Sequence, residues 1–154
     1  MTPEPIRRAV LVGLCAAVIT PPRLARADAP VLEVWKTPTC GCCADWVAHM
    51  AAAGFEPAVF DVDGATLSEL KARIGLTPER ASCHSAFVGG YLVEGHVPAD
   101  DVIRLLAERP DAAGLAVPGM PIGSPGMEMG DEREPYDVLL LRRDGSAEIF
   151  ASHR

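Results

Sequence analysis

The stretch "VLEVWKTPTCGCCADWVAHMAAAG" (residues 31–54) changes its hydrophobic period on either side of a cysteine motif. Residues 31–36 alternate in polarity and include β-branched and aromatic side chains, which predicts a strand. Residues 42–54 place apolar side chains at helical spacing and end in glycine, which predicts a helix. The predicted apolar face of this helix contains Cys43, Trp46, Val47, Met50 and Ala51. The stretch therefore predicts a strand, a turn and a helix, with the thiols of Cys40, Cys42 and Cys43 at the start of the helix.

The following segments alternate in the same manner. Strand-like segments are "EPAVFDV" (56–62) and the two halves of "SAFVGGYLVEG" (85–95), whose central Gly89-Gly90 indicates a hairpin. Helical patterns occupy 63–76, with Leu67, Leu70 and Ile74 expected to face inward, and 98–110, with acidic residues near its start. The predicted order is β-α-β-α-β-β-α. This order, with a cysteine motif after the first strand, predicts an α/β thioredoxin-like core.

The C-terminal part of the chain differs in composition. The segment "GLAVPGMPIGSPGMEMG" (114–130) is rich in glycine, proline and methionine and has no periodicity, which predicts a long loop of the kind that is usually functional. Residues 136–152 predict two strands around Asp144-Gly145, a strong hairpin signal. We interpret this Met-rich loop and hairpin as additions to a single thioredoxin-like domain, residues 28–154.

Residues 1–27 have the features of a signal peptide. Two arginines precede the apolar run "AVLVGLCAAVI" (9–19), which is too short for a membrane-spanning helix, and "ARA" (25–27) has the small-x-small pattern of a cleavage site. We expect cleavage after Ala27, periplasmic location and no stable membrane insertion afterwards. The paired arginines leave both general and twin-arginine export open.

Charge and cysteine content restrict the function. The net charge is -7 and becomes more negative once the basic leader is removed, so nucleic acid is not an expected partner. Four cysteines remain after cleavage, in a compartment where disulfides persist. Those four thiols belong to Cys40, Cys42, Cys43 and Cys83.

The cysteine motif fits either thiol exchange or metal binding, because a helix N-terminus favours the thiolate that both functions need. Two features favour metal. Cys42 is a third thiol inside the C-x-x-C of Cys40 and Cys43, which an exchange pair does not need. Cys83 and His84 stand before the third strand, where thioredoxins keep a proline, so a thiol and an imidazole are expected to face the motif.

The methionines of the loop favour copper over zinc. Thioether sulfur is a soft ligand that suits Cu(I), and a four-ligand zinc site of Cys40, Cys43, Cys83 and His84 would leave the methionines unexplained. The other histidines are expected to be structural: His49 on the surface, His96 in a turn and His153 in the tail. The three methionines predicted as ligands are Met120, Met127 and Met129.

The motifs "TPTCGCCADWVAHM", "SCHSAFVGGYLVEGHVPADDVIRLL" and "GLAVPGMPIGSPGMEM" resemble the exported CopG-type copper-resistance proteins, a thioredoxin-like family formerly described as a domain of unknown function. The resemblance extends from about residue 31 to the C-terminus. It implies a periplasmic protein that holds several copper ions in a cysteine-bridged cluster and interconverts Cu(I) and Cu(II). It implies no catalytic residue apart from the metal ligands, and it assigns the cluster to Cys40, Cys42, Cys43, Cys83 and His84.

Three other functions remain open from the sequence. The Cys40 and Cys43 spacing allows a thiol–disulfide oxidoreductase, and the same ligands allow a passive copper chaperone or store. A pair of structural disulfides is also possible, although neighbouring Cys42 and Cys43 would be strained as partners. Copper ions, and other periplasmic copper-handling proteins, are the expected partners.

Overall fold

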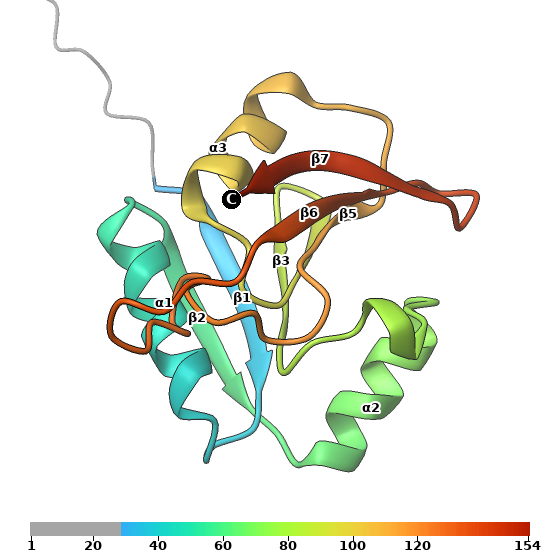
Figure 1. Cartoon of the computed structure of the whole chain (residues 1–154). Helices are drawn as coiled ribbons and strands as arrows, with labels where there is room; N and C mark the ends of the chain where they lie inside the picture. Colours follow the sequence, from blue (N-terminus) through green and yellow to red (C-terminus); the bar gives the residue numbers. More distant parts are fainter. Residues whose placement is uncertain (1–28) are drawn as a thin grey trace, which may run out of the picture.

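Within residues 29–154, which the computed structural model describes, seven strands form one mixed sheet in the order β2-β1-β3-β4-β5-β6-β7 (Figure 1). The predicted signal peptide lies outside these residues. The strands are β1 (Val31–Lys36), β2 (Glu56–Asp61), β3 (Ser85–Val88), β4 (Tyr91–Glu94), β5 (Gly114–Ala116), β6 (Tyr136–Leu141) and β7 (Ala147–His153). The helices are α1 (Gly41–Ala52), α2 (Gly64–Arg73) and α3 (Ala99–Glu108), with a short 3-10 turn at Pro78–Arg80.

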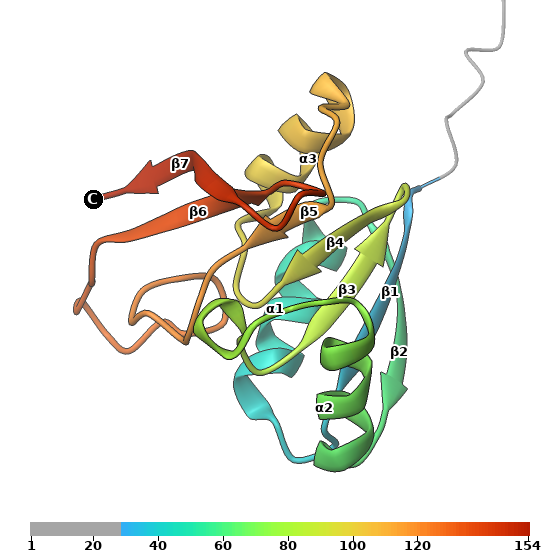
Figure 2. The same ribbon diagram turned by 90° about the vertical axis from the view of Figure 1, so that its right-hand side faces the viewer.

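The first half of the chain has the predicted order β1-α1-β2-α2-β3-β4-α3. Strands β1 and β2 run parallel, whereas β1 with β3 and β3 with β4 run antiparallel. Helices α1 and α2 lie on opposite faces of the sheet (Figures 1 and 2). The α/β class is therefore confirmed, and the element order and pairing are compatible with the thioredoxin-like layout.

The predicted loop over residues 114–130 is wrong for its first three residues. Gly114–Ala116 form β5, which pairs parallel with β4 and antiparallel with β6, so the predicted C-terminal hairpin extends the same sheet. A Cβ atom at Gly114 would lie 1.9 Å from the Leu92 carbonyl oxygen, which explains the glycine there. Three residues are too few to show a period, so this strand is stabilised by its neighbours and not by a local pattern.

The core lies mainly between the sheet and helices α1 and α3. Trp46 and Met50 of α1 and Leu105 of α3 are fully buried, whereas the predicted core position Ala51 is exposed and Val47 is half-buried. On α2 only one predicted core residue is buried, because this helix covers the sheet with a narrow face. That residue is Leu67; Leu70 is half-buried and Ile74 is exposed. Among residues 29–154 no helix is long and apolar enough to cross a bilayer.

Candidate metal centre

Four cysteine sulfurs converge from two segments that are distant in sequence. Cys40 is the N-cap residue of α1, Cys42 and Cys43 lie in the first turn of that helix, and Cys83 lies in the segment before β3. Because β1 pairs directly with β3, the turn after β1 and the segment before β3 meet at the same end of the sheet. All four Sγ atoms lie within 4.8 Å of one another.

The four sulfurs form one disulfide and two free thiols. Cys40 and Cys43 are bonded, whereas Cys42 and Cys83 are free. The Cys42 Sγ lies 3.5 Å from the Cys40 Sγ, and the Cys83 Sγ lies 3.4 Å from the Cys43 Sγ. Burial, and then the nearby Cys42 sulfur, raise the pKa of Cys83 to about 12, so Cys83 is a thiol in the metal-free protein. Each free thiol therefore touches a different sulfur of the disulfide.

His84 contributes a buried neutral imidazole. Its Nδ1 lies 3.4 Å from the Cys83 Sγ, and its ring packs against Trp46 at 4.4 Å between centroids. Its Nε2 is buried and has no hydrogen-bond partner within residues 29–154. Burial, together with neighbouring His96 and Lys71, lowers the pKa of His84 to about 3. An unprotonated imidazole is the form that binds metal, so the donor chemistry fits a soft or borderline cation.

His96 is a second imidazole at the cluster, where the sequence predicted only a turn residue. Its side chain is fully buried, with Nε2 3.1 Å from the Cys83 Sγ and Nδ1 2.8 Å from the Pro125 carbonyl oxygen. A carbonyl only accepts, so Nδ1 carries the proton and donates it to Pro125, which leaves the Nε2 lone pair facing Cys83. Cys83, His84 and His96 thus form a second group of possible metal ligands, which shares Cys83 with the four thiols.

The register of the predicted hairpin around Gly89-Gly90 could have placed His96 opposite Cys83. Strands β3 and β4 pair Ser85 with Glu94 around the Gly89-Gly90 turn. Extended by two residues, the same register puts residue 96 opposite residue 83. Taken locally, Gly-His-Val-Pro indicates only a turn, and for that reason the sequence-based prediction missed this pairing.

A buried ion pair anchors the segment that contains Cys83. Glu94 is fully buried and pairs with Lys71 of α2. Its carboxylate also accepts from the Ser82 backbone N–H at 2.7 Å and from the Ser85 hydroxyl at 2.6 Å. Burial raises the pKa of Glu94, although the adjacent Lys71 opposes that shift. Because Ser82 and Ser85 flank Cys83 and His84, this network fixes both sides of the ligand segment.

The loop after β5 reaches the site through backbone atoms. The Pro125 carbonyl accepts from His96, and Gly126 packs directly on the first turns of α1. Of the three methionines predicted as ligands, Met127 is half-buried, whereas Met120 is 51% and Met129 60% exposed. The structure therefore brings together the five predicted cysteine and histidine ligands. The metal roles of Met120, Met127 and Met129 stay a prediction.

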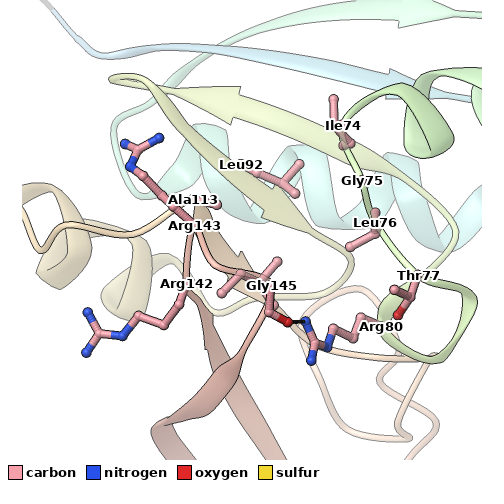
Figure 3. A pocket seen from close by; sticks show the side chains of 11 residues that line it. Ile74, Gly75, Leu76, Thr77, Arg80, Leu92, Ala113, Arg142, Arg143 and Gly145 are labelled. Atoms are coloured by element: carbon pink, nitrogen blue, oxygen red, sulfur yellow. Dashed lines mark hydrogen bonds between the residues drawn. The ribbon is translucent and has the colours of Figure 1, made fainter.

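A separate cavity of about 190 Å³ lies between the end of α2 and the β6–β7 turn (Figure 3). Its walls include Leu76, Leu92 and three arginines, none of which belongs to the cysteine and histidine cluster. Each guanidinium is already bound: Arg80 to the Gly145 carbonyl, Arg142 to Glu148 and Arg143 to Asp111. Arg142 and Arg143 are thus paired with carboxylates, whereas Arg80 donates to a neutral carbonyl.

The low pKa of His84 predicts a pH-dependent stability of the metal-free protein. Above about pH 6.5 the imidazole is neutral in both folded and unfolded chains; below it only the unfolded chain gains the proton. We expect His84 alone to lower the free energy of unfolding by about 2 kcal/mol between pH 7 and pH 5. Urea denaturation at both pH values should show a smaller loss in His84→Asn. An NMR titration in which the folded His84 ring protonates near pH 6.5 would contradict the prediction.

Comparisons with known proteins identify the family of the chain. A family model described as "Protein of unknown function, DUF411" matches residues 80–127, which include Cys83, His84 and His96. Two solved structures of a "Copper resistance protein copG", Forms 2 and 1, superpose with TM-scores of 0.76 and 0.74. They are 43% and 44% identical, and the alignments cover 82% and 80% of this chain and 99% and 96% of theirs. No curated protein matches the chain. The identity and the nearly complete coverage show that the chain belongs to the CopG family.

Proposed function

We propose that the protein binds copper in the periplasm as part of copper resistance. The observation that carries the proposal is the convergence of four cysteine sulfurs and two neutral imidazoles at one end of the sheet. Thiolates are soft ligands that select Cu(I), and imidazoles also suit Cu(II). The similar solved structures are of proteins named for copper resistance, which supports copper as the ion. We also propose that the chain is exported and cleaved after Ala27.

More than one copper ion per chain is part of this proposal. Cys83 belongs to both ligand groups, the four thiols and the set with His84 and His96. A thiolate shared between two groups can bridge two ions. The neighbouring sulfur-rich and nitrogen-rich donors also support a role in interconverting Cu(I) and Cu(II), since the two oxidation states differ in ligand preference.

Anaerobic titration of the fully reduced protein with Cu(I) tests the proposal. We expect at least two ions per chain to resist a competing chelator, and fewer in the protein that retains the Cys40–Cys43 disulfide, because bonded sulfurs cannot act as thiolates. Fewer than one tightly bound ion per chain would refute copper binding. If copper binds but its oxidation state does not change when an oxidant or reductant is added, the protein is a passive copper store or chaperone.

A thiol–disulfide oxidoreductase is the second candidate. The observation in its favour is the Cys40–Cys43 disulfide at the start of α1. Against it, His84 and not proline precedes β3, where a thioredoxin positions its substrate peptide. Insulin reduction that persists at copper saturation would favour this function, because copper and substrate would otherwise compete for the same thiols.

A further inference from the structure

We infer that the metal-free oxidised protein exchanges its disulfide internally, moving it from Cys40–Cys43 to Cys43–Cys83. The inference rests on the positions of three sulfurs and one imidazole. It concerns the protein without copper and goes beyond the proposed copper binding.

Cys83 is the internal thiol in contact with the buried half of the disulfide. The Cys43 side chain is fully buried, whereas Cys40 is half-buried at the N-cap of α1. A thiol from another molecule can therefore reach the Cys40 sulfur more readily than the Cys43 sulfur. The Cys83 Sγ, by contrast, already lies 3.4 Å from the Cys43 Sγ, about van der Waals contact for two sulfurs. Because the Cys83 and Cys40 sulfurs also lie within 4.8 Å of each other, the Cys83 side chain must rotate to come into line with the Cys40–Cys43 bond.

The surroundings of Cys83 also provide an acceptor for its proton. His96 Nε2 lies 3.1 Å from the Cys83 Sγ, and its tautomer is fixed by donation from Nδ1 to the Pro125 carbonyl. A nucleophile, a base within hydrogen-bond distance and a group that orients the base are thus adjacent, as in sites that activate a nucleophile. Burial raises the pKa of Cys83 and lowers that of His96, so the proton moves only as the sulfur attacks.

The exchange balances without an external oxidant or reductant. The Cys83 thiol gives its proton to His96 Nε2, and the sulfur attacks the Cys43 Sγ. The Cys43–Cys83 bond forms as the Cys40–Cys43 bond breaks, and the electron pair leaves on the Cys40 sulfur, which takes up a proton. The product has free thiols at Cys40 and Cys42, whose sulfurs lie 3.5 Å apart before the exchange. If the proposed function holds, this pair provides two thiolates for Cu(I) while one disulfide is retained.

Peptide mapping distinguishes the two disulfides directly. Trypsin leaves Cys40, Cys42 and Cys43 together in residues 37–71 and Cys83 alone in residues 81–104. Only a disulfide to Cys83 cross-links these peptides. The variant Cys42→Ala is the best starting point, because among residues 29–154 it retains three cysteines and can form one intramolecular disulfide.

The experiment treats metal-free, oxidised Cys42→Ala with excess iodoacetamide and follows the products over time. Attack by Cys83 exposes the Cys40 thiol, whose alkylation traps the cross-linked peptides, whereas direct alkylation of Cys83 leaves them separate. We expect cross-linked product with alkylated Cys40. Its absence, with alkylation of Cys83 alone, would overturn the inference.

His96→Asn is the matched variant for the proton acceptor. Asparagine can keep a donor to the Pro125 carbonyl but lacks the nitrogen that faces Cys83. We expect the yield of cross-linked product to fall at least about tenfold, since general-base catalysis contributes about 100- to 10,000-fold to the rate of a step. An unchanged yield would overturn the role of His96. No copper is used, so failure here is distinguishable from failure of the Cu(I) titration.

Discussion

Cys83→Ser is expected to lose at least half of the tightly bound copper and to weaken the remainder by at least about 100-fold. Loss of a residue that merely orients a metal ligand costs about 10- to 100-fold, and Cys83 is the one residue that the two ligand groups share. Serine keeps the size of the side chain but replaces a soft sulfur with a hard oxygen, which Cu(I) disfavours. Competition with a Cu(I) chelator on the reduced variant measures both the number of ions and their affinity.

Cys42→Ser is the matched comparison for Cys83→Ser. Cys42 is also a half-buried free thiol, but it belongs to the four-thiol group alone. We expect it to lose less copper than Cys83→Ser and to leave the group with His84 and His96 intact. Equal losses in the two variants would contradict the bridging position of Cys83. Circular dichroism establishes that both variants are folded.

Gly126→Ala is expected to lower the free energy of unfolding by about 2 to 4 kcal/mol. Its φ of +82° is strained for any residue with a Cβ atom. That Cβ would also lie 2.6 Å from the Cys42 carbonyl oxygen and 2.7 Å from the Trp46 nitrogen. Both are backbone atoms of α1 that cannot rotate away, so the loop itself must move. Urea denaturation measures the loss.

Gly119→Ala separates the clash from the backbone strain. Gly119 has a similar φ of +70° in the same loop, but a Cβ atom added there would meet nothing within 4 Å. We expect it to cost about 1 to 2 kcal/mol, the conformational part alone. If Gly126→Ala costs no more than Gly119→Ala, the close approach of the loop to α1 is not a source of stability.

Gly126→Ala should also affect the candidate metal centre. Pro125, which accepts the hydrogen bond from His96, directly precedes Gly126. A displaced loop would release the imidazole that faces Cys83, so we expect weaker copper binding in Gly126→Ala than in Gly119→Ala. This connects the glycine- and proline-rich loop to the site through its backbone.

The sequence by itself determined the α/β class and the order of the first seven elements. Alternating polarity over residues 31–36, helical spacing after Cys43 and the Gly89-Gly90 hairpin are local patterns, and each belongs to an element of the predicted type in the structure. The cysteine motif was equally readable, because three thiols within four residues need no tertiary contact to be noticed. Cys83 and His84 were found because the element order places them opposite that motif.

Only the tertiary structure decided the features that depend on contacts between distant residues. Strand β5 has no period of its own and forms because β4 and β6 pair with it. His96 looked like a turn residue until the register of β3 and β4 brought it to Cys83. The order of elements could not show that Pro125 accepts a hydrogen bond from His96 or that Gly126 packs on α1. These contacts follow from the packing of a loop without periodicity, which no local pattern encodes.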